Sequence, residues 1–312
     1  MLTRESLKRD IARLFIWYPV RWFFRILPVK TSIKLLYLMG EMHFKLFKNT
    51  LRHIEKNIKM GLPDIREEGL QSVLRSYLRN HYFDRLHIFL YPRFIRNIKH
   101  VDSLIEFSGL NHLDHALSAG KGVILTLGHY GPIQLPLFGL GSKGYSIIQI
   151  GLPVDEGFSW IGRNVAFRLR MKYEGMIPAK IFPADKFLRP IFTQLKDNGA
   201  VMVTIDPAGG GKWLGKIIRF PFLGGSIPFP VGPASLSVKT GAPLLPVSVH
   251  RKLEGKYNCE IHPPLSCNTD NPLEITAYLV RWYEDQVAID PGLWHFWDEF
   301  ESGKLLPASD LS

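Results

Sequence analysis

The sequence of 312 residues contains little cysteine, and none of it is spaced to bind a metal. Cys259 and Cys267 lie outside any CxxC pattern, so we expect two ordinary thiols in a reducing compartment. No other cluster has metal-ligand spacing either, and we expect no metal and no cofactor. With 46% hydrophobic and 21% charged residues, the chain is neither disordered nor a small disulfide-stapled module. Its length allows one large α/β unit with an appendage, or two ordinary domains.

Long apolar runs are also missing, because no segment reaches the roughly 18 uninterrupted apolar residues of a confident membrane-spanning helix. Residues 11–29 are dense in Phe, Trp, Ile and Leu, but Arg13, Arg21 and Arg25 interrupt them. A signal-peptide pattern ending in a small-residue cleavage site is absent as well. We therefore expect the N-terminal arm to be retained and the body to be cytosolic.

Acidic residues are scarce at the N-terminal end. Residues 1–60 hold 13 basic and four acidic side chains, a net charge of +9, and residues 61–100 add a further +3. The remaining 212 residues carry 19 basic and 20 acidic side chains and are close to neutral. A basic arm on a neutral body predicts a polyanionic partner, either nucleic acid or an anionic membrane surface.

The apolar content of the arm favours the membrane. On a helix, four arginines spaced at multiples of four make one basic stripe beside a broad apolar face, which is typical of a helix in the membrane interface. The next segment repeats this geometry, and no nucleic-acid-binding motif is present. A core helix of a soluble protein and a true spanning helix stay open as alternatives. The basic and acidic positions of the two segments are Arg9, Arg13, Arg21 and Arg25, then Lys34, Glu41, Lys45 and Lys48.

The rest of the chain shows two hydrophobic patterns, a helical one followed by a strand-like one. Apolar residues recur at helical spacing over about 64–97, after a break at Gly61-Leu-Pro63, and residues 185–197 also predict a helix. Short apolar runs bounded by glycine predict buried strands of an α/β sheet covered on both faces. We expect membrane-associating helices over 1–60, a helical connection over 61–100 and an α/β domain over 101–312. The predicted strands are Gly122–Leu127, Tyr145–Ile150, Ala200–Ile205 and Pro243–Val249.

The first of these strands ends in a histidine. The run Gly122–Gly128 delivers His129 to the carboxyl end of a buried strand, where ligands bind in open α/β sheets. A histidine in this place acts as a general base near neutral pH when another group orients its second ring nitrogen.

Several segments, in their order and spacing, resemble the lipid A late acyltransferases, within the wider lysophospholipid acyltransferase superfamily. The resemblance covers nearly the whole chain. The segments are the basic N-terminus, Arg52–Ile58 before Gly61-Leu-Pro63, Gly122–His129, Asn198–Asp206, Arg219–Gly224, Gly232–Ala234, Lys239–Pro243, Leu245–Val247 and Pro291–Trp297.

The resemblance implies a glycerolipid acyltransferase-like fold, with a central mixed sheet flanked by helices. It also implies transfer of a fatty acyl chain from an acyl carrier protein thioester, or a CoA thioester, to a hydroxyl of a lipid A-type glycolipid. The expected location is the cytoplasmic face of the inner membrane. A lysophospholipid or another glycolipid as acceptor stays open, and so does a lipid-binding homologue that has lost catalysis.

The superfamily signature places an acid five residues after the histidine, and here that position is Gln134. An amide can hold the tautomer of His129 through its oxygen, but it offers no negative charge. Three outcomes are open: a slower enzyme, an acid from elsewhere, or a fold without catalysis. Asp206, at the end of a predicted strand, is the candidate substitute acid, with turn capping as the alternative role.

Other positions are candidates for binding substrate. The glycine run Pro207–Gly211 has the flexibility to bring backbone N–H groups to a phosphate or an oxyanion. Arginines near apolar turns are candidates for acceptor phosphates or an acidic carrier protein, with a solvated helix face as the alternative. His250 and His295 are interpreted as structural histidines. The predicted substrate-binding residues are Arg163, Arg168, Arg170, Arg189, Arg219 and Gly224.

Overall fold

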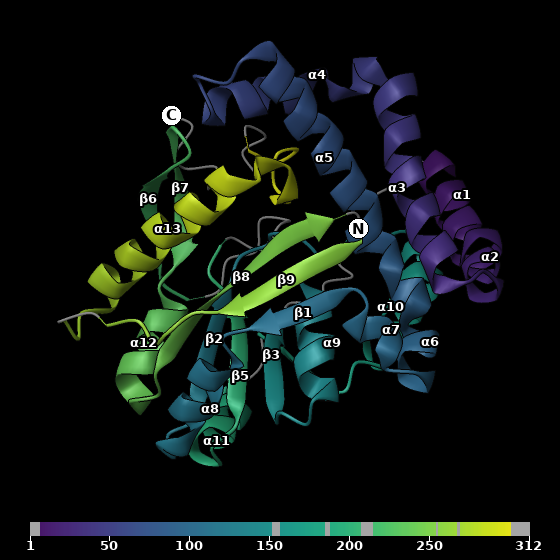
Figure 1. The fold of residues 1–312 in the computed structure, drawn as a ribbon. Coiled ribbons are helices and arrows are strands. Elements are labelled where there is room, and N and C mark those ends of the chain that lie inside the picture. Colours follow the sequence, from purple (N-terminus) through teal and green to yellow (C-terminus); the bar gives the residue numbers. More distant parts are fainter. Residues whose placement is uncertain are drawn as a thin grey trace.

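The protein is described by a computed structural model, which covers residues 7–151, 157–184, 188–206, 215–253, 255–266 and 269–300 (Figure 1). A seven-stranded mixed sheet flanked by helices forms its centre, and this confirms the expected fold class. The strand order is β1-β9-β8-β2-β5-β3-β4. The strands are β1 (Ile105–Ser108), β2 (Val123–Leu127), β3 (Ile147–Gly151), β4 (Lys180–Pro183), β5 (Ala200–Thr204), β8 (Leu244–Leu253) and β9 (Lys256–Ile261).

The middle of the sheet is parallel. β2 pairs in parallel with β5 on one side and β8 on the other, with Leu125 opposite both Met202 and Leu245. All five residues of β2 are buried, as expected of a central parallel strand with helices on both faces. Each of the four predicted strands is confirmed. The sheet becomes mixed where β9 runs antiparallel to β8.

Helices cover the sheet, and a small hairpin stands beside it. The hairpin consists of β6 (Ile217–Phe222) and β7 (Gly225–Pro230), which are antiparallel and pack against α13 (Pro272–Ile289). The remaining helices of this part are η3 (Gly162–Phe167), α10 (Arg168–Glu174), α8 (Leu110–Ser118), α9 (Gln134–Ser142), α11 (Arg189–Lys196), α12 (Gly232–Thr240) and η4 (Pro291–Leu293).

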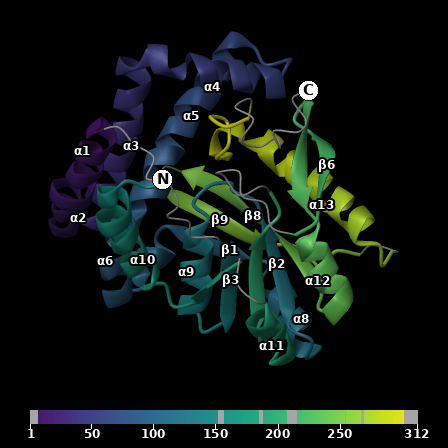
Figure 2. The ribbon, with the colours of Figure 1, turned by 180° about the vertical axis from the view of Figure 1, so that it is seen from behind.

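Before the sheet, the chain is helical. The predicted helix over 64–97 is confirmed as three consecutive segments, α5 (Glu67–Leu86), η2 (His87–Leu90) and α6 (Tyr91–Arg96). Seen from behind, α1–α3 lie on one side of the molecule and α13 with β6 on the other (Figure 2). The helices are α1 (Leu7–Phe15), η1 (Ile16–Val20), α2 (Arg21–Ile26), α3 (Val29–Leu46), α4 (Lys48–Gly61), α5 (Glu67–Leu86), η2 (His87–Leu90), α6 (Tyr91–Arg96) and α7 (Lys99–Asp102).

The first three helical segments, which we call the arm (residues 7–26), turn apolar side chains outward. Six large apolar residues recur three or four positions apart, so they share one face, and they are 45–74% exposed. The opposite face packs on the body, where the Trp17 and Phe89 ring centroids are 5.2 Å apart. A π-helical turn at η1 holds Pro19, which lacks the N–H of a regular turn. The outward residues are Leu7, Ile11, Phe15, Tyr18, Trp22 and Ile26.

Two charged residues, Arg13 of the arm and Glu41 of α3, turn inward and so depart from the expected stripes. Arg13 points toward the body, where its Nη1 donates to the Ser159 hydroxyl at 3.3 Å and its guanidinium lies over the Phe158 ring. Glu41 of α3 likewise turns inward and accepts from Arg75 at 2.6 Å. Helical periodicity places these residues on a helix face, but the packing partner decides which face turns inward. Among the described residues, no helix combines the length and apolar run needed to cross a bilayer.

Candidate active site

The histidine at the end of β2 is held on a tight turn. After Leu127 the chain passes through Gly128, and a Cβ there would lie 1.9 Å from the ring of Tyr283, so only glycine fits. Gly131 follows with φ +65°, a left-handed conformation that favours glycine. These two glycines present His129 at the carboxyl end of β2.

The sheet register brings an aspartate to the same place. Leu127 of β2 lies opposite Thr204 of β5, and both strands run in the same direction. His129 and Asp206 each stand two residues beyond this pair, so they meet at one edge of the sheet. This adjacency follows from parallel pairing, since the carboxyl ends of neighbouring parallel strands share an edge.

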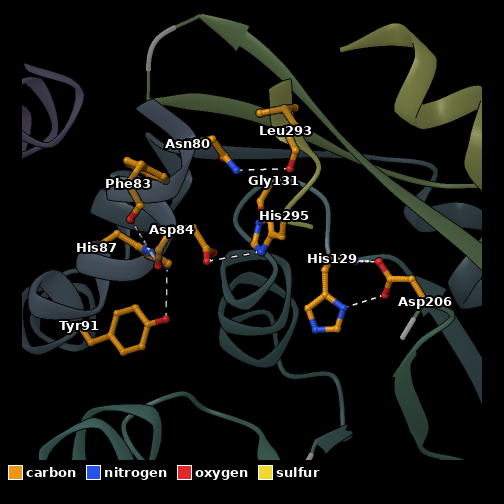
Figure 3. A network of polar contacts seen from close by, with 10 residues as sticks. All are labelled: Asn80, Phe83, Asp84, His87, Tyr91, His129, Gly131, Asp206, Leu293 and His295. Atoms are coloured by element: carbon orange, nitrogen blue, oxygen red, sulfur yellow. Dashed lines mark hydrogen bonds and ion pairs between the residues drawn. The ribbon is translucent and has the colours of Figure 1, made fainter. Parts of the chain in front are cut away.

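Asp206 binds the histidine through both carboxylate oxygens (Figure 3). The Nδ1–H of His129 donates to Oδ1 at 2.7 Å, and the His129 backbone N–H donates to Oδ2 at 2.7 Å. The hydroxyl of Tyr283 also donates to Oδ2, at 2.8 Å. The Asp206 side chain is fully buried, and each of these donors compensates its desolvation.

This arrangement sets the protonation of the ring. Burial lowers the pKa of His129, whereas the charge of Asp206 and its hydrogen bond raise it, and the net direction is upward. Because Nδ1 carries the proton given to Asp206, Nε2 is the basic nitrogen of the neutral ring. Nε2 makes no hydrogen bond to another described residue, and the side chain is 21% exposed. The geometry is that of a general base with an oriented second nitrogen.

A C-terminal segment, residues 290–300, forms the wall beside His129. The backbone N–H of His295 donates to the His129 carbonyl at 3.0 Å, and the Gly131 N–H donates to the Leu293 carbonyl at 2.9 Å. The His295 Nε2–H donates to the Gly131 carbonyl at 2.7 Å, and its Nδ1 lies 3.8 Å from Asp84 (Figure 3). The Phe296 and His129 ring centroids are 5.0 Å apart. The His129 turn is thus held by this segment as well as by the sheet.

Burial, together with the nearby His129, outweighs Asp84 and lowers the pKa of His295. The ring of His295 is therefore neutral near pH 7, which suits its interpretation as a structural histidine. His295 and Phe296 lie within the aromatic segment Pro291–Trp297, which gave a sequence signal through the family resemblance. Tyr283 gave none, because one tyrosine on an amphipathic helix is an ordinary core residue.

Gln134 lies apart from this contact. It is the first residue of α9, and its Oε1 is buried without a hydrogen-bond partner among the described residues. The Nδ1 of His129 is bonded to Asp206, so the structure places Asp206, and not Gln134, on the orienting nitrogen. A catalytic role for Gln134 stays a prediction.

The predicted substrate arginines are exposed, and they lie on the η3–α10 stretch, on α11 and on the β6–β7 hairpin. Arg163, Arg168 and Arg170 share the η3–α10 stretch, next to the arm, and Arg170 pairs with Glu174 at 2.6 Å. Arg189 begins α11. Their binding roles stay predictions.

The other two predicted binding positions lie on the β6–β7 hairpin. Arg219 donates to the Ser226 carbonyl within the hairpin. Gly224, with φ +66°, forms the hairpin turn, and a Cβ there would lie 3.2 Å from the Met60 carbonyl oxygen. The glycine run Pro207–Gly211 and Cys267 lie outside the described residues, and Cys259 is a buried free thiol.

Comparison with known proteins identifies the family. Residues 3–299 match the family model of bacterial lipid A biosynthesis acyltransferases. The chain belongs to this family. It is also 29% identical over 194 residues to a phosphatidylinositol mannoside acyltransferase of Mycobacterium tuberculosis (strain H37Rv), covering 60% of this chain and 57% of that protein. A protein of the same name from Mycolicibacterium smegmatis is 26% identical over 198 residues, covering 61% of this chain and 60% of the relative. The chain therefore spans less than two thirds of the length of these relatives.

Proposed function

We propose that this chain transfers a fatty acyl group from a thioester donor to a hydroxyl of a membrane glycolipid. The observation that carries the proposal is the hydrogen bond from His129 Nδ1 to Asp206, which leaves Nε2 basic and partly accessible at the sheet edge. Asp206 takes the place of the acid missing at position 134. Among the three outcomes left open by the sequence, this contact favours an acid supplied from elsewhere.

In the first step, Nε2 of His129 takes the proton of the acceptor hydroxyl, and the oxygen attacks the thioester carbonyl carbon. The imidazolium that forms lies against the carboxylate of Asp206, which stabilises its positive charge. Asp206 accepts hydrogen bonds from both the backbone N–H and the ring Nδ1–H of His129. These two contacts keep the ring from rotating, so Nε2 stays facing the acceptor hydroxyl.

In the second step, the tetrahedral intermediate collapses and the carbon–sulfur bond breaks. The proton on Nε2 passes to the leaving thiolate, and the neutral ring is regenerated. The reaction needs no oxidant and consumes no further reactant, since the ester formed replaces the thioester broken.

The acceptor is a glycolipid by analogy with both comparisons. The matched family is named for lipid A biosynthesis, and the mycobacterial relatives are named for phosphatidylinositol mannoside. We propose an acyl carrier protein or CoA thioester as donor, with Arg163, Arg168 and Arg170 near the arm as candidates for phosphate or carrier contacts.

We further propose that the arm binds an anionic membrane at the cytoplasmic face of the inner membrane. Its outward face carries Leu7, Ile11 and Trp22, each more than half exposed, and residues 1–60 have a net charge of +9. Apolar insertion and attraction to anionic headgroups add together in interfacial helices.

An acyl-transfer assay tests the proposed reaction. Full-length protein is incubated with bacterial membrane glycolipids and with either a carrier-protein or a CoA thioester, and acylated lipid is followed by mass spectrometry. We expect one donor to give product and the His129→Ala variant to give none. The matched control is His262→Ala, a half-buried histidine of the body that contacts Ser248.

A result in which wild type and His129→Ala transfer acyl chains equally contradicts the assignment of the base. A protein that binds glycolipid but transfers nothing from either donor favours the non-catalytic alternative.

A further inference from the structure

A basic cavity of about 280 Å³ opens between α5 and the end of β8, apart from His129. Sites that admit one water molecule need only roughly 10–15 Å³, so this cavity accommodates a larger group. Its helical side is one face of α5, formed by residues spaced three and four apart. The lining residues are Ser72, Arg75, Ser76, Arg79, Arg251, Lys252 and Leu253.

Cationic groups outnumber the acids around this cavity. Four of the seven lining residues are cationic, and three carboxylates pair with them. The charge of Lys45 also lowers the pKa of Glu41, and the charge of Lys256 lowers that of Glu106. Two of the three carboxylates therefore have a further positive charge nearby. The field in the cavity is positive and favours an anion. The ion pairs are Arg75 and Arg79 with Glu41, Arg251 with Asp290, and Lys252 with Glu106.

The ion pairs leave donors available. Arg75 contacts Glu41 through Nε, at 2.6 Å, so its two terminal NH₂ groups have no acceptor among the described residues. Arg251 uses Nη2 for both Ser76 and Asp290, which leaves its Nε and Nη1 hydrogens unused within the described chain. Guanidinium groups with two free N–H groups match the oxygens of phosphate in pairs.

One apolar residue lines the cavity, and further exposed apolar residues lie on the neighbouring helix α3. Leu253, on its lining, is 66% exposed. Glu41, which pairs with Arg75 and Arg79, lies on α3 one turn from Leu38 and beside Met42, which are 50% and 51% exposed. A positive cavity with the exposed Leu253 on its lining matches the chemistry of a lipid, whose phosphate lies directly above its acyl chains.

We propose that this cavity binds the phosphate group of an anionic lipid headgroup, as a site separate from the His129 centre. The same helix joins the two places, because Asn80 of α5 donates to the Leu293 carbonyl in the wall beside His129. From Ser76 to Asp84 the helix rises about 12 Å, so a lipid bound here lies near the membrane acceptor. The site fixes the orientation of the protein on the bilayer.

Calorimetric titration of the full chain tests the site without depending on acyl transfer. The ligands are dihexanoyl phosphatidic acid below its micelle concentration, inorganic phosphate, and dihexanoyl phosphatidylcholine. We expect phosphatidic acid to saturate at one equivalent and to bind at least roughly tenfold more weakly to the Arg75→Gln/Lys252→Gln variant. Both side chains are about half exposed, so the variant is expected to fold, and thermal unfolding checks this.

The control variant, Lys180→Gln/Lys196→Gln, removes the same charge from exposed positions of β4 and α11 and should bind within about twofold of wild type. Equal binding of phosphatidic acid to wild type and the cavity variant overturns the proposal, as does an equal loss in the control variant. If inorganic phosphate binds as tightly as phosphatidic acid, the ligand is free phosphate and the lipid assignment is wrong. Saturation by phosphatidylcholine with the affinity of phosphatidic acid also overturns it.

Discussion

The arm exposes apolar side chains to solvent, whereas the carboxyl ends of β2 and β5 bury a charged one. The arm exposes Trp22 and Ile26 by 56% and 74% and turns Arg13 toward the body. The strand ends bury the carboxylate of Asp206 and compensate it with three donors. Exposed apolar groups are costly in water and cease to be so in a bilayer, whereas a buried charge is tolerated only with its partners in place. The first arrangement therefore suits attachment, and the second suits chemistry.

The largest expected effect lies at the strand ends. Changing Asp206→Asn removes the charge that stabilises the imidazolium, and we expect kcat to fall on the order of 10³–10⁴-fold. Burial lowers the pKa of His129 and Asp206 no longer raises it, so the pKa of His129 falls in this variant. The acidic limb of kcat/KM, which reports the loss of the His129 proton, moves to lower pH. Steady-state rates between pH 5 and 9 measure both effects.

Vesicle binding should be unchanged in Asp206→Asn, because the arm is intact. A variant that retains more than about a tenth of wild-type kcat would show that Asp206 is not the required acid.

The second effect concerns the arm. The Trp22→Ser/Ile26→Ser variant loses two side chains that would enter the bilayer, and we expect partitioning to anionic vesicles to fall on the order of 10²-fold. Co-sedimentation measures the partitioning. The matched control is Tyr278→Ser/Ile289→Ser, because these residues of α13 are 51% and 64% exposed on the other side of the molecule. An equal loss in both variants would mean that the arm is not the attachment surface.

A smaller effect is expected at Tyr283. The Phe variant keeps the ring against Gly128 but loses the hydroxyl that donates to Asp206. We expect kcat to fall about tenfold, since one charge-assisted hydrogen bond no longer positions the carboxylate. The charge of Asp206 then acts more strongly on His129 and raises its pKa further, so the acidic limb moves to higher pH. Tyr278→Phe, on the exposed face of the same helix, is the control. If Tyr283→Phe has the same kcat and pH profile as this control, Tyr283 has no positioning role.

The smallest effect is expected at Gln134. Asp206 already occupies Nδ1 of His129, so the Gln134→Glu variant adds a second acid where the existing side-chain oxygen has no donor. An unpaired buried carboxylate is protonated, and we expect kcat within about threefold of wild type. A tenfold rise in the same assay would instead show that the site lacks an acid.

The sequence predicted the parts of the fold that depend on local pattern. The run Val123–Leu127 is apolar at every position except Thr126, and such runs are typical of buried parallel strands. Asp206 was a candidate because it follows the predicted strand Ala200–Ile205. Its pairing with His129 could be predicted only with the strand order, because β5 lies next to β2 in the sheet but is not the next strand along the chain.

Residues brought in from distant elements could not be predicted in the same way. Tyr283 reaches Asp206 from α13, and nothing in the helical pattern separates it from a core tyrosine. The basic stripe also depended on context, because the π-helical turn at Pro19 and the contact with Phe158 decide where Arg13 points. Periodicity gives the faces of a helix, and tertiary packing chooses among them.

The segment that forms the wall beside His129 is also the last part of the site to be synthesised. During synthesis, β2 and β5 emerge well before Tyr283, Leu293 and His295, so a partly made chain has the histidine and its acid without the contacts that hold their turn. The catalytic turn is completed last, when residues 290–300 pair with it. Chains that stop early or are clipped near residue 290 therefore lack the contacts that hold the His129 turn.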